Sequence, residues 1–400
     1  MKAEICKWYR DTLAPVVFMI DDFANVWIDT NGNGVIDHGE DWGFAGRGPG
    51  SSLVFLEEKL LKDFPQVKVT FFVPVGIRSG VIENPSISFV SEKINSDPET
   101  KAFFRSVGDN PRYEVAYHGT NHGKPGQEAR DFIQEWDTFD SLEQAKEVIN
   151  AGKEIFKEVF NVYPAGGKYC GYVSNRFSDD SIDQSGFLWW CRYSNVGLYE
   201  CKNCAIGGQD FNPLSNFDVK YFGCANVVDI PTTLNGSLLS GILNPGVYNL
   251  KGIAKRILKP FLIKIRLKKL DFLLKNHLVV CIQEHIAPSR VDGMRQKPNI
   301  FDDLDSLRMI MQYLRKKRVW YCTCSELAQY VVARDATTIE SHSENNFTIR
   351  TDSPRAVNTT LTIRIKNDGN GRIIQPDGTE VTVRYQLADI KVMNGVYNLI

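Results

Sequence analysis

The sequence predicts an α/β domain followed by a small all-β domain. Through roughly the first 330 residues, short apolar runs suited to strands buried on both faces alternate with helical patterns. After Ala333, apolar residues alternate with polar ones, which is the period of two expected of strands with one solvent-exposed face. A length of 400 residues agrees with two units, and we expect them at 1–334 and 335–400. The strand–helix alternation fits an α/β barrel or a doubly wound sheet.

Each predicted element has its own local signal. The apolar runs at 15–20, 67–73, 114–117 and 278–282 predict strands, and the patterns at 53–61, 141–160 and 303–317 predict helices. Ser141 and Gln144 have the spacing of a capping box at a helix start. In the second domain, alternation at 347–349, 361–365 and 381–387, with Gly-containing turns between, predicts a sandwich of about 60 residues.

Composition excludes several protein classes. Lys and Arg number 47 against 48 Asp and Glu, a net charge of −1, which argues against nucleic-acid binding along the whole chain. Nine cysteines without framework spacing argue against a disulfide-stapled scaffold. No signal peptide or membrane-spanning run is recognisable, so we expect a cytoplasmic protein.

Polar residues follow three of the predicted strands. Asp21 and Asp22 come after the first, His118 and His122 after the third, and His285 ends the last. In α/β barrels the carboxyl ends of strands carry the chemistry, and two histidines four residues apart can aim at one metal. The Asp-Asp pair alone also fits an Asx turn that closes a strand.

Together these residues resemble the polysaccharide deacetylases, the NodB-homology domain of carbohydrate esterase family four, over residues 12–332. The resemblance implies a distorted (β/α) barrel. By that resemblance Asp21 would be the general base, Asp22 a metal ligand with His118 and His122, and His285 the general acid. Such a site leaves metal positions open to polarise a carbonyl and acidify a water.

The chain departs from the pattern of that family at several positions. Gly119 stands where the family has Ser or Thr, and Lys168 followed by Tyr169 replaces the arginine motif that orients the base. We therefore expect a divergent branch with Lys168 as the positioning cation. Tyr169, Trp189 and Trp190 are the expected substrate contacts, although the tryptophans fit a core equally well.

A second motif predicts a calcium loop at residues 29–40. Asp29, Asn31 and Asn33 hold positions 1, 3 and 5, Val35 would offer its carbonyl, and Glu40 would be bidentate at position 12. Because a strand, not a helix, precedes it, we expect a lone loop beside the active site. The alternative is a solvated Asn-Gly loop.

The segment 251–275 carries nine basic residues and one acid, interleaved with apolar residues. Such a helix can lie on an anionic membrane, which makes peripheral membrane contact a candidate property. A crossover helix with a solvated basic face is an equal alternative.

The sequence thus predicts a metal-dependent hydrolase, with zinc favoured and calcium in addition, that removes an N-acetyl or other N-acyl group from a sugar or a lipid-linked glycan. An O-acetyl esterase on the same fold, or a non-catalytic carbohydrate-binding scaffold, are the alternatives.

Overall fold

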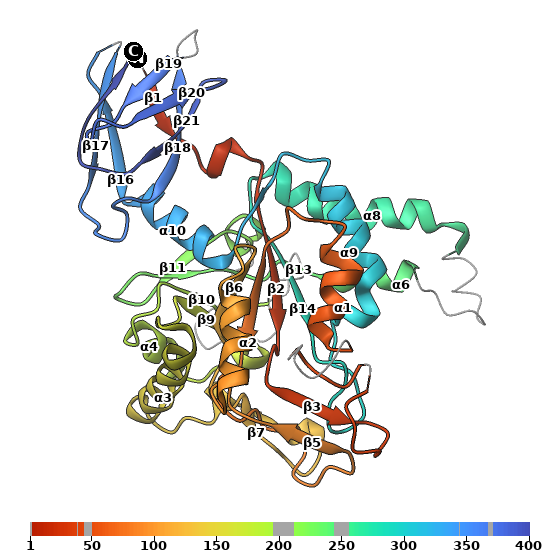
Figure 1. The fold of residues 1–400 in the computed structure, drawn as a ribbon. Coiled ribbons are helices and arrows are strands. Elements are labelled where there is room, and N and C mark those ends of the chain that lie inside the picture. Colours follow the sequence, from red (N-terminus) through yellow and green to blue (C-terminus); the bar gives the residue numbers. More distant parts are fainter. Residues whose placement is uncertain are drawn as a thin grey trace.

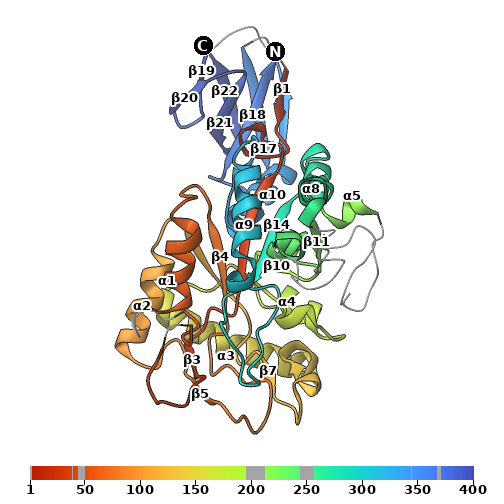
Figure 2. The same cartoon turned by 90° about the vertical axis from the view of Figure 1, so that its right-hand side faces the viewer.

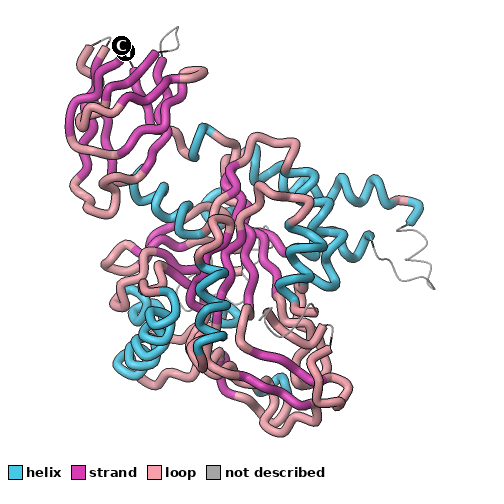
Figure 3. The backbone as a smooth tube through the Cα atoms, in the orientation of Figure 1, coloured by secondary structure: helices cyan, strands magenta, loops and turns pink. Residues whose placement is uncertain are grey.

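The computed structural model describes residues 2–37, 39–43, 50–194, 212–243, 256–343, 345–366 and 371–400. Strands run through the middle of the larger domain with helices around them, and an all-β sandwich lies at one pole (Figures 1 and 3). The expected distorted barrel with a C-terminal sandwich is confirmed. Residues 251–255 of the basic segment and His38 of the predicted calcium loop lie outside the described residues.

The barrel is built on a ten-stranded sheet, and all its pairings are parallel except that of β11 with β12. Its order is β11-β12-β10-β9-β6-β4-β2-β14-β13, with β15 also paired to β2. Its strands are β2 (Pro15–Asp21), β4 (Val69–Val73), β6 (Tyr113–Tyr117), β9 (Gly166–Lys168), β10 (Trp189–Cys191), β11 (Lys220–Phe222), β12 (Val227–Asp229), β13 (Leu234–Asn235), β14 (Val280–His285) and β15 (Trp320–Tyr321).

The segment 227–235 contains β12, which lies beside the edge strand β11, and β13, which is the opposite edge of the sheet. At its start Val228 pairs with Trp189 of β10, and at its end Leu234 pairs with Ile282 of β14. Each of these pairings covers only two residues, so the segment connects the two sides of the curled sheet through short contacts.

Strand alternation decides which side chains face the barrel interior. In β2, Phe18 and Ile20 pack with the helices, whereas Val17 and Met19 pack in the interior core. Since the side-chain period of a strand is two, Asp21 continues the inward row.

The same alternation holds in β14. Val280 and Ile282 face the helices, and Cys281 faces the interior. Gln283 and His285 therefore point inward, and the pairing sets His285 directly beside Asp21.

The helices of the described residues include the three predicted at 53–61, 141–160 and 303–317, with small shifts at the ends. They are α1 (Ser52–Leu56) continued by the π turn η3 (Glu57–Leu61), α2 (Pro98–Gly108), α3 (Leu142–Phe160), α4 (Ser178–Asp183), α5 (Pro213–Asn216), α6 (Ser240–Leu243), α8 (Lys259–Lys275), α9 (Ile300–Leu314) and α10 (Cys324–Asp335). At the start of α3, the Ser141 side chain accepts from the Gln144 N–H as expected, but the Gln144 side chain accepts from the Asp140 N–H. In the described ranges no helix has both the length and the apolarity needed to cross a bilayer.

The sandwich follows α10. One sheet has the order β16-β17-β22-β19-β20 and the other β1-β18-β21. The strands are β1 (Lys2–Ile5), β16 (Thr337–Ser341), β17 (Asn346–Thr351), β18 (Thr360–Lys366), β19 (Gly371–Ile374), β20 (Glu380–Val383), β21 (Leu387–Lys391) and β22 (Gly395–Leu399). Residues 2–5, which we expected in the barrel domain, instead form β1 here and pair antiparallel with β18. Both ends of the chain therefore lie at the sandwich pole (Figure 2).

Candidate active site

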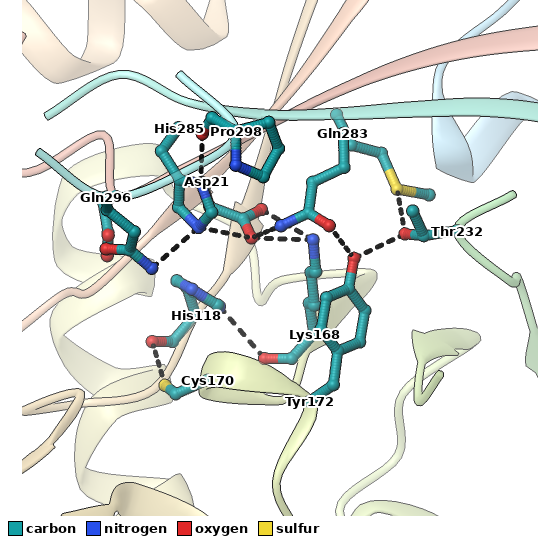
Figure 4. Close-up of polar contacts among 12 residues, drawn as sticks. Asp21, His118, Lys168, Cys170, Tyr172, Thr232, Gln283, His285, Gln296 and Pro298 are labelled. Atoms are coloured by element: carbon teal, nitrogen blue, oxygen red, sulfur yellow. Dashed lines mark hydrogen bonds and ion pairs between the residues drawn. The ribbon is translucent and has the colours of Figure 1, made fainter. Parts of the chain in front are cut away.

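Asp21 lies at the centre of a buried polar network inside the barrel (Figure 4). The Lys168 Nζ lies 2.9 Å from Oδ1 and 2.7 Å from Oδ2 of Asp21. Asp21 is 3% exposed and Lys168 is fully buried, so both charges are removed from bulk water. The Lys168 ammonium also lies over the rings of Phe72 and Tyr172, at 5.1 and 4.4 Å from their centroids. Lys168 thus holds Asp21 by a contact with both oxygens.

A second donor fixes the other side of the Asp21 carboxylate. The Gln283 Nε2 donates to Asp21 Oδ2 at 3.1 Å, and the Gln283 Oε1 accepts from the Tyr172 hydroxyl at 2.6 Å. The Tyr172 hydroxyl also lies 2.6 Å from Thr232 Oγ1. Among the described residues Lys168 is the one donor to Asp21 Oδ1, which leaves a lone pair to take a proton from a water.

His285 completes this group. Its Nδ1 lies 2.7 Å from the Pro298 carbonyl oxygen, which requires a proton on that nitrogen. Its Nε2 lies 3.8 Å from Asp21 Oδ2 and 2.8 Å from the Gln296 amide nitrogen. The Gln296 amide can offer N–H to a neutral imidazole, or its oxygen to a protonated one after a flip. This geometry lets His285 Nε2 change its protonation state without losing its partner.

The loop from His118 to His122 is shaped by a buried carboxylate. Glu135 accepts the backbone N–H groups of Thr120, Asn121 and His122 at 2.8, 2.8 and 2.6 Å. Burial raises the pKa of Glu135, although those three hydrogen bonds oppose the shift. Gly119 has φ +83°, and a Cβ there would lie 2.5 Å from a Glu135 oxygen. The glycine that departs from the family pattern is therefore required by this loop.

His118 and His122 are brought together as expected, with ring centroids 5.0 Å apart. His118 Nδ1 lies 3.2 Å from the Lys168 carbonyl oxygen, which leaves Nε2 as the basic nitrogen. His122 Nε2 lies 3.1 Å from Asp22 Oδ1, and His122 Nδ1 is buried without a hydrogen-bond partner. Burial lowers the pKa of His118 to about 3 and also lowers that of His122, so both imidazoles are neutral, as metal ligands must be.

The third member of this group is Cys170 and not Asp22. One ligand atom from each of His118, His122 and Cys170 lies within 4.8 Å of the others, and these three residues could hold a metal ion. The Cys170 thiol donates to the His118 carbonyl oxygen at 3.2 Å. Burial, with Glu135 nearby, raises the pKa of this thiol, which therefore stays protonated until a cation displaces the proton.

Asp22 is held by Arg78. The Arg78 Nε lies 3.2 Å from Oδ1 of Asp22, and its Nη2 lies 3.4 Å from Oδ2. Both residues are buried, and the guanidinium also stacks over Trp42 at 4.5 Å. Although burial opposes ionisation, Arg78 and His122 hold the pKa of Asp22 well below its ordinary value. A cation already contacts both oxygens of Asp22, and the role of Asp22 as a metal ligand stays a prediction.

The three expected substrate contacts are core residues here. Trp189 and Trp190 are fully buried on opposite faces of β10, Trp189 in the interior core and Trp190 in the helix-facing core. Tyr169 is also fully buried, and its hydroxyl donates to Asp179 at 2.7 Å. None of the three has a surface that a glycan could reach in this structure.

The predicted calcium loop follows β3 (Val26–Asp29), which pairs with β5 (Ser88–Ser91), so no helix precedes it. The Asp29 carboxylate accepts the N–H groups of Gly32, Asn33 and Gly34 at 2.7 to 3.1 Å. The Glu40 carboxylate accepts those of Thr30 and Asp37, at 2.7 and 2.8 Å.

The other predicted calcium ligands form a cluster on the exposed side of the loop. The side-chain amides of Asn31 and Asn33 both donate to Asp37, at 2.6 and 2.9 Å, and Val35 is exposed. The loop is therefore compact, and calcium binding by it stays a prediction.

Sequence reasoning missed Gln283, Tyr172, Cys170, Glu135 and Arg78. A signal existed for Gln283, because it stands two residues before His285 on the same strand and so on the same face. Cys170 stands two residues after Lys168, in the motif that we had already singled out. Glu135 and Arg78 do not lie on the barrel strands, and no local sequence pattern marks them.

No protein-family model matches the chain, and no curated protein sequence does. Solved structures similar to it include one titled a putative polysaccharide deacetylase, from Mycobacterium smegmatis, with 16% identity over 85% of this chain and 98% of that one and a TM-score of 0.48. A probable polysaccharide deacetylase from Pseudomonas aeruginosa has 14% identity over 82% and 93%, with a TM-score of 0.44. An allantoinase has 13% identity over 82% and 92%, with a TM-score of 0.47. The similar structures thus include the family that the motifs resemble.

Proposed function

We propose that this chain is a hydrolase that cleaves an N-acyl amide bond, with Asp21 as general base and His285 as general acid. The observation that carries the proposal is the buried Asp21, contacted on both oxygens by Lys168 and set beside the His285 imidazole. A carboxylate and an imidazole at the ends of adjacent strands can supply the general base and the general acid of amide hydrolysis. The substrate class, an acylated sugar, rests on the sequence resemblance.

In this mechanism Asp21 Oδ1 takes a proton from the attacking water through its free lone pair. Lys168 and Gln283 keep the carboxylate in place as it does so. His285 delivers a proton from Nε2 to the leaving nitrogen, and the Pro298 carbonyl keeps the opposite side of the ring oriented.

The residues present fit a metal through His118, His122 and Cys170, because His122 Nδ1 is buried and unpartnered and the three donor atoms are close together. Two nitrogens and a sulfur suit zinc, which when bound would polarise the acyl carbonyl and acidify a water. Asp22 would then orient His122 through its 3.1 Å contact, the role of a carboxylate behind a metal-bound histidine.

The test measures acetate release from N-acetylglucosamine oligomers and from O-acetylated xylan oligomers. Asp21→Asn should lower kcat about 10²- to 10⁴-fold, and His285→Gln should cost a similar factor at unchanged fold. Asp63→Asn and His342→Gln repeat the same chemical changes at exposed positions and should leave activity intact. Full activity in Asp21→Asn would refute the assignment of Asp21 as the general base. Release from the O-acetylated oligomers alone would favour the esterase.

The metal is tested separately by elemental analysis of protein purified without a metal-affinity tag. We expect the wild type to contain about one equivalent of zinc. The zinc content should fall in His122→Ala and in Cys170→Ala, whereas Asp22→Asn should still bind zinc, at reduced affinity. Loss of zinc in Asp22→Asn with retention in Cys170→Ala would instead restore Asp22 as the ligand.

A further inference from the structure

Helix α8 and the turn before it carry an apolar stripe that faces solvent. Within nine residues, Ile257 is 75% exposed, Phe261 62%, Leu258 49% and Ile265 42%. Phe261 and Ile265 are spaced by four within α8 (Lys259–Lys275), so they lie on one side of the helix, and Ile257 and Leu258 are exposed just before its start. Among the described residues no other stretch of this length exposes four large apolar side chains.

The opposite side of the same helix is fixed to the barrel. Leu270, Leu273 and Leu274 are buried in the helix-facing core, and Ile263 and Leu267 pack against it. A surface helix ordinarily turns one apolar face to the core and a polar face to water. Here the core-facing requirement is already met by the buried leucines, so the exposed stripe needs a separate explanation.

Basic side chains border this stripe. Arg256, Lys264, Arg266 and Lys268 are all exposed, and in the part of the chain that the structure describes none of them forms an ion pair. The acid of α8, Asp271, accepts from the Tyr313 hydroxyl of α9. The local positive charge therefore stands unneutralised beside apolar surface, in a chain whose net charge is −1.

We propose that α8 and the turn before it, residues 256–268, form a peripheral docking surface for an anionic lipid membrane. The apolar stripe would enter the boundary between headgroups and acyl chains, and the lysines and arginines would lie at the level of the phosphates. A second copy of the chain fits less well, because two such basic surfaces repel each other. The helix lies on the outside of the larger domain (Figures 1 and 2).

The test is flotation of the full chain with vesicles of phosphatidylcholine alone, or of phosphatidylcholine mixed with phosphatidylserine. The wild type should float with the mixed vesicles only, and added salt should weaken the binding. Lys264→Glu with Lys268→Glu should lower the partition coefficient at least about tenfold. Lys62→Glu with Lys316→Glu makes the same charge change at exposed positions elsewhere and should bind like the wild type.

Phe261→Ser separates the apolar contribution from the charge. It should weaken binding about tenfold while the dependence on salt persists. Since Phe261 is exposed, the variant should keep the wild-type near-UV circular dichroism. Absence of wild-type binding to the mixed vesicles, or equal binding by the two double-lysine variants, overturns the proposal. So does a dimer in solution that Phe261→Ser dissociates, because the stripe would then be covered by a second copy.

Discussion

Replacing Lys168 with methionine is expected to destabilise the barrel more than any surface change, because it leaves the buried Asp21 carboxylate without its cation. Methionine keeps most of the volume of the lysine stem but removes the ammonium that lies within 2.9 Å of both Asp21 oxygens. Removing one partner of a buried ion pair costs about 3–5 kcal/mol. Because Gln283 still donates to Asp21 at 3.1 Å, we expect the lower end of that range, about 3 kcal/mol.

The partner change completes a double-mutant cycle. Asp21→Asn alone leaves the ammonium buried and should also destabilise, whereas the double variant removes both charges of the pair. We expect a coupling free energy of about 2–3 kcal/mol in favour of the pair. Urea denaturation followed by tryptophan fluorescence measures it, since Trp136, Trp189 and Trp190 are all fully buried in the barrel.

A surface lysine supplies the control for this cycle. Lys62→Met, at an exposed position, should change the free energy of unfolding by no more than about 0.5 kcal/mol. Additive effects of the two single changes at Asp21 and Lys168, or a Lys168→Met cost below about 1 kcal/mol, would refute the assignment of this pair as a buried, coupled charge network.

Three further predictions concern pH and calcium. Because the pKa of His118 is about 3 in the folded protein, against about 6.5 unfolded, acid favours the unfolded chain below pH 6.5. In the metal-free protein, protonation of His118 on unfolding should lower the free energy of unfolding by about 2 kcal/mol by about pH 5. In urea titrations the free energy of unfolding of His118→Gln should depend correspondingly less on pH. Burial raises the pKa of Glu284, so its contribution to stability is present below its unfolded pKa and is lost as pH rises. The free energy of unfolding of Glu284→Gln should exceed that of the wild type by at least about 1 kcal/mol at pH 8 and by much less at about pH 5. An equal difference at both pH values would contradict a raised pKa of Glu284. For the loop at 29–40, calcium at 100 times its Kd should add about 2.7 kcal/mol of stability, measured as a melting shift that chelator reverses and Glu40→Gln abolishes.

The position of the candidate site was largely predictable because strand ends can be located in a sequence. Apolar runs locate strands, and a polar residue at the exit of each run is a clear signal. Asp21 and His285 are found in this way, and their direct pairing in the sheet follows once β2 and β14 are neighbours. Which strands are neighbours is a property of the whole fold, and a local pattern does not contain it.

The tryptophan pair shows how the same alternation can be overlooked. Adjacent residues of a strand face opposite sides, so Trp189 and Trp190 could not both line one groove once they were placed in a strand.

The role of Arg78 could not be predicted from the sequence for a different reason. It lies 56 residues from Asp22 in a loop, and only the folded chain brings its guanidinium onto that carboxylate.

The pairing of β1 with β18 ties the first residues of the chain to nearly its last. Glu4 and Lys366, which form an ion pair across this contact, are separated by 362 positions. At about 5–20 residues per second, a ribosome needs roughly 20–70 s to add the partner after the first strand has emerged. During that interval β1 has no strand to complete it, while the intervening barrel segments can already assemble. The sandwich can therefore be completed only after the barrel segments have been made, because it needs β1 together with the strands from β16 to β22.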